Sequence, residues 1–306
     1  LVDRGDDVTS LTFGDTRSLA GVRTTCVSCD LLDETTMGAL VEGADLVFHL
    51  ASVITLRSRR NDLAERINTE GARIIAEACR THGVRRLIHF SSIHAFSPYP
   101  LGEAVDERRP LCDDRHPFPY DRSKARGQRH VLDAVARGLD AVIVHPTGIM
   151  GPFDFGPSQA ARGVIDLYRN RLAFLVGGGF NWVDVRDVSA GALAAAERGV
   201  AGENYILSGH YVSLEELGRC ITVMAGRTRS PRIIPLWAAQ SFAPLTEAWA
   251  AWRKREPRFS AFTIHTLQHH AVVSHEKATQ AFDYRPRPFE DTLRDTLEWF
   301  RQADML

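Results

Sequence analysis

A tyrosine and a lysine four residues apart, Tyr120 and Lys124, lie in the segment PFPYDRSKARGQRH, which is typical of the beginning of a helix. Residues i and i+4 share one face of a helix, so the ammonium group can lie near the phenol or near a ligand that the phenol contacts. A neighbouring positive charge favours phenolate over phenol, and we therefore expect the pKa of Tyr120 to fall from about 10 toward neutrality. The pair predicts a general base that removes a proton from an alcohol.

A hydroxyl group that could hold the substrate oxygen is found in the segment HFSSIHAF, at Ser92. Ser92 ends a β-like run, and the carboxyl ends of strands face the ligand crevice in doubly wound sheets. A strand ending in Ser-Ser, a loop, Y-x-x-x-K at the beginning of a helix and a strand ending in HPTG follow one another in the chain. This order of motifs is much less common by chance than the Y-x-x-x-K spacing alone, and so it is the stronger indication of an active site.

The elements that must position these residues alternate between short β-like runs and helical segments. Such alternation, with strands apolar on both faces, predicts an α/β fold: a doubly wound parallel sheet with helices on both faces. The expected strands are 6–12, 23–29, 45–51, 85–92 and 140–146, and the expected helices between them lie near 35–42, 63–82 and 120–137. After Pro146, further helices are expected near 158–170, 186–198, 213–225, 236–253, 274–282 and 289–302.

Composition excludes several other classes of protein. The net charge of −1 shows no excess of basic residues that would bind the phosphates of a nucleic acid. The most apolar stretch, 233–254, is interrupted by Pro235, Pro244 and Glu247, so no membrane span is expected. We interpret it as an amphipathic helix pair lining an apolar cavity; contact with a membrane surface is the less common alternative. This alternative would use Trp237, Trp249 and Trp252.

Cysteine usage and the start of the chain favour a reducing, cytoplasmic location. Five cysteines do not make a disulfide framework, and no signal peptide opens the sequence. Cys26 and Cys29 have C-x-x-C spacing, but no second pair lies at zinc-finger distance. On a strand these two side chains would point to opposite faces. No metal site is expected.

The order of these motifs resembles that of the extended short-chain dehydrogenases/reductases, the NAD-dependent epimerase/dehydratase family. This family includes nucleotide-sugar epimerases and dehydratases, dihydroflavonol-reductase-like enzymes and 3β-hydroxysteroid-dehydrogenase-like enzymes. The resemblance implies a Rossmann-like dinucleotide-binding domain, 1–150 plus about 182–208, and a smaller, mainly helical substrate lobe, 151–181 and 209–306. The family's first strand and G-x-x-G-x-x-G turn, expected just before 6–12, do not occur in this sequence.

The resemblance also implies roles for individual residues. Tyr120 would be the catalytic base, Ser92 would orient the reacting oxygen, and Lys124 would also bond the nicotinamide ribose. Asn68 would support the active site, and His94 is either a substrate contact or part of a polar loop. The remaining residues implied to lie against NAD or NADP are Asp30, Leu31, Leu50, Ala51, Ser52, Ser91, Pro146, Thr147, Gly148 and Ile149.

The residue that follows Ser92 reduces the number of family reactions that this chain is expected to catalyse. The family's dehydratases carry an Asp-Glu pair there, whereas Ile93 cannot transfer a proton, so dehydration is disfavoured. The apolar second lobe favours an oxidoreductase that interconverts a partly lipophilic secondary alcohol and ketone. The alternatives are a nucleotide-sugar epimerase, or a non-catalytic relative that lacks full cofactor binding because the phosphate turn is missing.

Cofactor choice and assembly stay open. After the second strand, an acidic residue would bind the ribose 2′-hydroxyl of NAD and a basic residue the 2′-phosphate of NADP. Thr12 and Phe13 stand there, with Asp15 and Arg17 shortly after, so the charge of these residues does not decide between the two cofactors. NADP is favoured if Arg17 folds back. Asp184 and Asp187 are equally consistent with helix N-caps and with ligand contacts. The resemblance implies a small-molecule substrate and a possible homodimer packed through 63–82 and 120–137.

Overall fold

A four-stranded parallel sheet forms the centre of the protein in the computed structural model, which describes residues 1–54, 62–241, 261–268 and 271–306. The strands follow the order β3-β4-β5-β9, and His49 pairs with His89 in the parallel register. Every residue of β5 is buried, as expected for a strand covered on both faces. The strands are β3 (Leu46–His49), β4 (Arg86–Phe90), β5 (Ala141–Pro146) and β9 (Asn204–Leu207).

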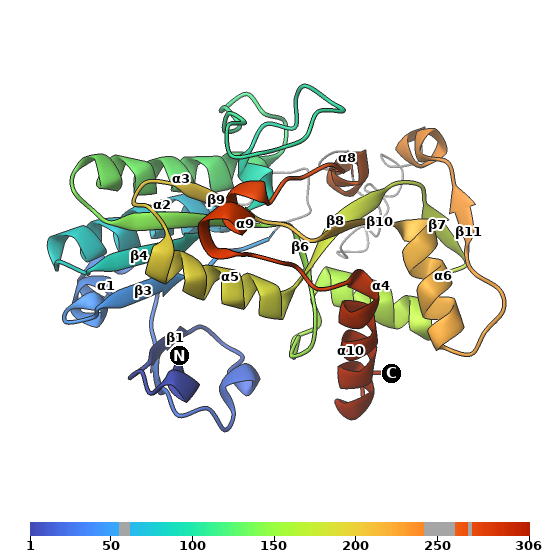
Figure 1. The fold of residues 1–306 in the computed structure, drawn as a ribbon, viewed down its shortest axis with the longest axis horizontal. Coiled ribbons are helices and arrows are strands. Elements are labelled where there is room, and N and C mark those ends of the chain that lie inside the picture. Colours follow the sequence, from blue (N-terminus) through green and yellow to red (C-terminus); the bar gives the residue numbers. More distant parts are fainter. Residues whose placement is uncertain (55–61, 242–260, 269–270) are drawn as a thin grey trace.

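Helices cover both faces of this sheet (Figure 1). One face carries α2 (Asp62–Thr81) and α3 (Pro119–Ala136), and the other carries α5 (Val185–Arg198) and α9 (Glu276–Phe282). Alternate residues of β4 enter the two cores, with Leu87 facing α2 and α3 and Ile88 facing α5. The doubly wound parallel architecture predicted from the sequence is confirmed.

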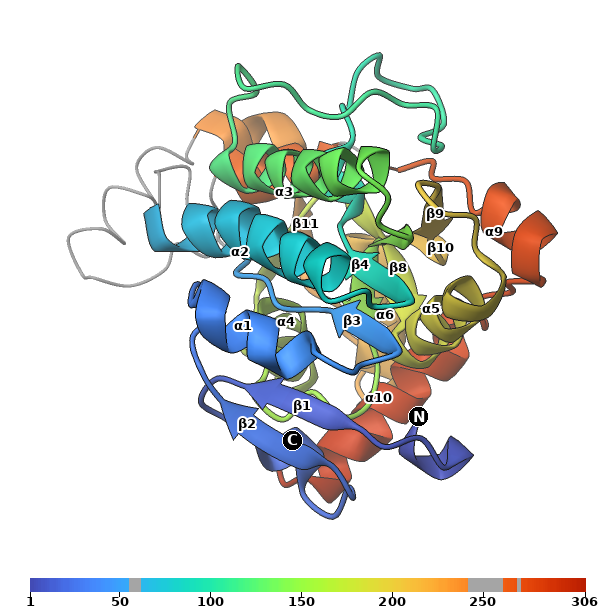
Figure 2. The ribbon, with the colours of Figure 1, turned by 90° about the vertical axis from the view of Figure 1, so that its left-hand side faces the viewer.

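The first part of the chain forms a separate two-stranded parallel sheet of β1 (Thr9–Thr12) and β2 (Thr25–Ser28). Figure 2 shows this pair beside α1 (Glu34–Val41), on the β3 side of the central sheet. Asp33 caps α1 by accepting hydrogen bonds from the backbone of Thr35 and Thr36. Among the described strands, β1 and β3 are not hydrogen-bonded to each other and so belong to separate sheets. Two short 3-10 helices, η1 (Val2–Arg4) and η2 (Arg17–Leu19), flank β1.

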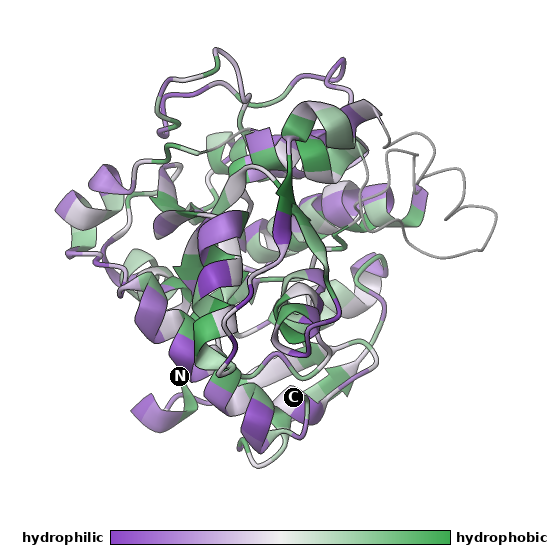
Figure 3. Cartoon of the chain, turned by 90° about the vertical axis from the view of Figure 1, so that its right-hand side faces the viewer, coloured by the Kyte–Doolittle hydropathy of each residue, from purple (hydrophilic) through white to green (hydrophobic). Residues whose placement is uncertain are grey.

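The second part of the chain packs around smaller sheets. One sheet has the order β10-β8-β6, and β11 pairs with β7. A third core fills the space between these strands and their helices, and Figure 3 shows hydrophilic and hydrophobic residues alternating along the helices. The elements are β6 (Gly148–Met150), α4 (Gln159–Tyr168), β7 (Phe174–Val176), β8 (Gly179–Asp184), β10 (His210–Ser213), α6 (Leu214–Met224), β11 (Arg232–Ile234), α8 (Ala261–Gln268) and α10 (Phe289–Gln302).

The segment 233–254 differs in part from the sequence-based interpretation. Its first residues belong to β11, so the expected helix pair is wrong there: Ile233 pairs with Leu175 in a parallel ladder. A helix does begin at residue 236, but most of the expected helix 236–253, with Trp249 and Trp252, lies outside the described residues. No helix in the described ranges is both long and apolar enough to cross a membrane. The division into a cofactor domain and a substrate lobe stays a prediction.

Candidate active site

Tyr120 and Ser92 lie in contact at the carboxyl end of the central sheet. Helix α3 begins with Pro119 at its first position, which places Tyr120 in the first turn. Ser92 lies two residues beyond β4, where its Oγ accepts a hydrogen bond from the backbone N–H of His94 and so caps the short helix η3 (Ile93–Ala95). The hydroxyl group of Ser92 lies close enough to that of Tyr120 to influence its pKa, and both residues are buried.

Burial dominates the acidity of Tyr120. Removal from water raises the pKa of Tyr120 to about 12; the neighbouring Ser92 hydroxyl opposes this shift, and the adjacent Asp121 adds to it. Lys124 is not among the causes of this shift in the protein itself, and a lowering of the pKa of Tyr120 by Lys124 together with a bound nicotinamide cation stays a prediction. The lysine Nζ is instead directed at the carbonyl of Phe90, 2.9 Å away, and at Ser52 Oγ, 3.4 Å away.

Lys124 is itself a perturbed group. It is buried, and this burial lowers the pKa of Lys124 to about 8. The two acceptors that Nζ contacts, at the ends of β4 and β3, use two of the three donors of an ammonium group. Within the described ranges these are its side-chain partners, which leaves one N–H direction for a ligand hydroxyl at this edge of the sheet.

Asn68 joins the end of β3 to the two helices above it. Its Oδ1 accepts hydrogen bonds from Ser52 Oγ and from the backbone N–H of Val53, at 2.9 and 2.8 Å. Its Nδ2 donates to the carbonyl of Val53 and to Ser123 Oγ, both at 3.0 Å. Both ends of the amide are thus engaged by protein groups, so this geometry makes Asn68 a clamp on the strand end rather than a group facing a ligand.

A buried polar network beneath Ser92 escaped the sequence analysis. His145 Nδ1 lies 3.0 Å from the carbonyl oxygen of Ser92, and its Nε2 lies 2.9 Å from Asn204 Oδ1. Gln128 bridges Asn204 and Ser91, at 2.7 and 2.9 Å. Burial lowers the pKa of His145 to about 4, so the ring is neutral.

The sequence did contain two signals for this network. His145 interrupts the otherwise apolar run AVIVHP, and Gln128 follows Lys124 by one helical turn. Neither polar residue has a reason to be fully buried unless it is hydrogen-bonded. The network fixes the main chain at Ser91 and Ser92, and with it the direction of the Ser92 hydroxyl.

The residues expected to line the cofactor fall into two groups. The first has exposed side chains at the carboxyl edge: Leu50, 62% exposed, Ile149, 41% exposed, and Ala51. The second group is engaged within the protein: Leu31 packs against Gly71, Ser91 bonds Gln128, Thr147 bonds Asn181, Ser52 bonds Asn68, Pro146 is buried, and Gly148 pairs with Trp182. Asp30 is exposed, and its carboxylate accepts from the N–H of Leu32.

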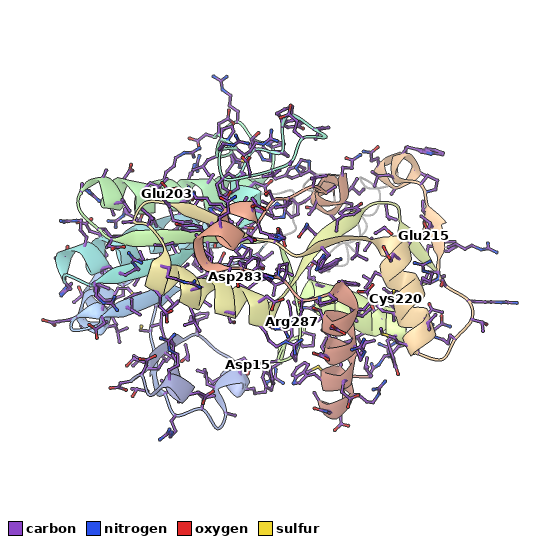
Figure 4. The ribbon with its side chains drawn as sticks, in the orientation of Figure 1. Asp15, Glu203, Glu215, Cys220, Asp283 and Arg287 are labelled. Carbon is purple, nitrogen blue, oxygen red and sulfur yellow. The ribbon has the colours of Figure 1, made fainter. Side chains whose placement is uncertain are left out.

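This edge fits a nicotinamide nucleotide. Exposed apolar side chains at the ends of parallel strands suit a flat ring, and Lys124 offers a donor beside them. Arg17 does fold back, but onto Asp15: its guanidinium contacts both carboxylate oxygens, and this pairing lowers the pKa of Asp15 to about 2. Figure 4 shows Asp15 on the first part of the chain, near β1 and β2. The pair leaves the choice between NAD and NADP open.

Aromatic side chains surround Tyr120. Phe262 of α8 contacts the rings of Tyr120 and His94, with centroids 6.1 and 5.5 Å apart. Phe118 packs against Phe262 at 5.2 Å, and His94 lies 5.6 Å from Tyr120. His94 is therefore a neighbour of the tyrosine, as a substrate contact would be, and the wall around the pair is largely aromatic.

Of the two aspartates left open by the sequence, Asp184 caps α5 by accepting from the N–H of Arg186. Asp187 accepts hydrogen bonds from the side chain of Arg287, which Figure 4 shows between α5 and α10. Both aspartates thus have structural partners.

Comparisons with known proteins identify the family of this chain. The family described as "NAD dependent epimerase/dehydratase family" matches residues 1–208. Sterol demethylase protein B of Methylococcus capsulatus is 28% identical over 100% of this chain and 94% of its own. Human 3 beta-hydroxysteroid dehydrogenase type 7 is 26% identical over 92% of this chain and 83% of its own.

A solved structure, that of gox2253, superposes with a TM-score of 0.86 at 28% identity and covers 100% of this chain and 93% of its own. The sequence match and the fold therefore agree. The chain belongs to the NAD-dependent epimerase/dehydratase family, within the extended short-chain dehydrogenases/reductases, and is an NAD-dependent enzyme of that type.

Proposed function

We propose that the protein interconverts a secondary alcohol and a ketone on a lipophilic, sterol-like substrate. The observation that carries this proposal is the pair of neighbouring buried hydroxyl groups, Tyr120 and Ser92, at the carboxyl edge of the sheet. Two neighbouring hydroxyls can both hydrogen-bond the oxygen of a substrate that enters between them. Such an oxygen is where an alcohol loses its proton or a ketone gains one.

Each neighbouring residue would have one task in this reaction. Ser92 would orient the substrate oxygen, and Tyr120 would take up the alcohol proton or return it to the ketone. Lys124 would hold the cofactor ribose with its remaining N–H, and Asn68 would keep the end of β3 in place. The bound nicotinamide would supply or accept the hydride.

The aromatic wall supports a lipophilic substrate. Phe262 and Phe118 present apolar surface beside Tyr120, and burial of apolar substrate area stabilises by about 25 cal/mol per Å². Two of the relatives carry sterol or steroid names, sterol demethylase protein B and 3 beta-hydroxysteroid dehydrogenase type 7. A four-ring alcohol matches the wall better than a charged sugar nucleotide does.

The proposal is tested by turnover of 3β-hydroxysterols with NAD or NADP, followed as reduced cofactor, in parallel with UDP-glucose epimerisation. Tyr120→Phe should lower kcat about a hundredfold to ten-thousandfold, in line with the loss of a general base, while cofactor affinity stays within a few fold. Tyr211→Phe, at a tyrosine 43% exposed on β10, is the matched control and should keep full turnover.

Two outcomes would overturn the proposal. Unchanged sterol turnover in Tyr120→Phe would remove the tyrosine from the reaction. Epimerisation of UDP-glucose without any oxidation of sterols would instead assign the protein to the sugar-nucleotide branch of the family.

A further inference from the structure

A second group of reactive side chains lies behind Tyr120. Cys112, His116 and Asp121 each offer one donor atom, and these three atoms lie within 4.8 Å of one another. All three residues are buried, with Asp121 only 1% exposed. A thiol, an imidazole and a carboxylate form the donor set typical of zinc, which takes sulfur, nitrogen and oxygen ligands.

Two of these side chains lack hydrogen-bond partners. Neither ring nitrogen of His116 and neither carboxylate oxygen of Asp121 is hydrogen-bonded within the described part of the chain. Because buried polar groups are almost always satisfied, two such side chains facing one another need an explanation. A cation held between them would satisfy both.

The charge of Asp121 leads to the same conclusion. A buried carboxylate is costly unless a positive charge compensates it. Among the ion pairs of the described residues, its neighbours are His94 Nδ1 at 3.2 Å and His116 Nδ1 at 3.6 Å, and no lysine or arginine. A cation beside Asp121 would supply the missing compensation.

Helix α3 holds the loop that carries two of the three donors. Arg122 donates to the carbonyl oxygen of His116 at 2.5 Å, and Arg129 donates to that of Cys112. Asp121 belongs to the same helix. The backbone at all three positions is therefore fixed relative to α3, so little ordering would accompany the arrival of an ion.

We propose that Cys112, His116 and Asp121 bind one Zn²⁺ ion, which ties the segment 112–116 to the first turn of α3 beside Tyr120. Zinc–ligand bonds of about 2.0–2.3 Å place tetrahedral donors roughly 3.5 Å apart, so the three atoms would draw together by about one ångström. The fourth position would be taken by water or by a neighbouring side chain. The proposal departs from the absence of a metal site expected from the sequence.

Binding replaces the thiol contacts of Cys112. Its Sγ now lies 3.3 Å from the carbonyl oxygen of Phe96 and 3.8 Å from that of His94, as a thiol donor does. The S–H bond would break as the S–Zn bond forms, and the proton would pass to solvent. No electrons are exchanged, because zinc does not change its oxidation state.

The first experiment measures zinc per chain by atomic emission after the protein is loaded with Zn²⁺ and passed over a desalting column. One equivalent is expected for the wild type. Cys112→Ser and His116→Ala should each weaken binding roughly a hundredfold or more, since even outer-shell changes cost 10–100-fold. Cys79→Ser, at a buried cysteine of α2, is the matched control and should retain the ion.

The second experiment uses Co²⁺ on the wild type and does not depend on how the variants fold. A thiolate–cobalt charge-transfer band and visible bands typical of tetrahedral cobalt are expected at one equivalent. Absence of both signals from the wild type, or equal zinc retention by Cys112→Ser and His116→Ala, would overturn the site. Tyr120→Phe should bind zinc as the wild type does, so the proposed activity and the proposed metal site can fail separately.

Discussion

Burial of a charged lysine should make the stability of this protein depend on pH in a defined direction. Lys124 is buried, and its pKa is about 8 in the folded protein against 10.5 for an exposed lysine. Each unit of difference corresponds to about 1.4 kcal/mol, so the charged ammonium lowers the free energy of unfolding by about 3 kcal/mol near neutral pH. Replacement by an uncharged side chain of similar length, Lys124→Met, removes this contribution.

Between pH 8 and pH 10.5 the unfolded chain holds the lysine proton and the folded protein does not. The wild type should therefore gain stability as pH rises through this window, and the gain is absent below pH 8, where both states are protonated. From pH 7.5 to pH 10 the wild type is expected to gain about 2 kcal/mol relative to Lys124→Met. The hydrogen bonds to Phe90 and Ser52 that Lys124→Met loses add an offset at both pH values, which cancels in this comparison.

Urea unfolding of both proteins at the two pH values measures this difference. Lys277→Met, which removes a partly exposed lysine paired with Glu203, controls for the loss of an ammonium group as such. If the difference in unfolding free energy between wild type and Lys124→Met changes by less than about 0.5 kcal/mol from pH 7.5 to pH 10, the buried-charge reasoning is refuted.

Two further substitutions test the buried hydrogen-bond network beneath Ser92 and the close packing of α2 against α3. Gln128→Leu leaves the buried Ser91 hydroxyl without its partner and removes one of the two contacts of Asn204 Oδ1, the other being with His145. Urea unfolding should show a loss of about 1–3 kcal/mol, and unchanged stability would contradict the network. Gly127→Ala places a Cβ 2.3 Å from the carbonyl oxygen of Asn68 and should lower the free energy of unfolding by about 1–3 kcal/mol. Its control, Gly163→Ala, adds a Cβ in open space on α4 and should raise the free energy of unfolding by about 0.5–1 kcal/mol. Equal effects of the two substitutions would exclude the close approach of α2 and α3.

The periodicity of the chain was enough to predict the central sheet. Continuous apolar runs such as AVIVHP are typical of strands buried on both faces, and the helix near 120–137 lies within one residue of α3. The prediction of a helix pair over 233–254 was wrong at its start, because Ile233 pairs with β7, which lies almost 60 residues earlier in the chain. Short apolar runs do not reveal such long-range pairing.

Local spacing determined that Tyr120 and Lys124 share one face of a helix, and the order of the strands placed Ser92 at the same edge of the sheet. Only the tertiary structure decided how these groups titrate, because their desolvation depends on residues distant in the chain, such as Phe262 over Tyr120. The same holds for the contacts of His145 with Ser92 and for the cluster of Cys112, His116 and Asp121. Sequence spacing fixes which side chains can meet within one element, whereas burial and hydrogen-bond partners arise from packing between elements.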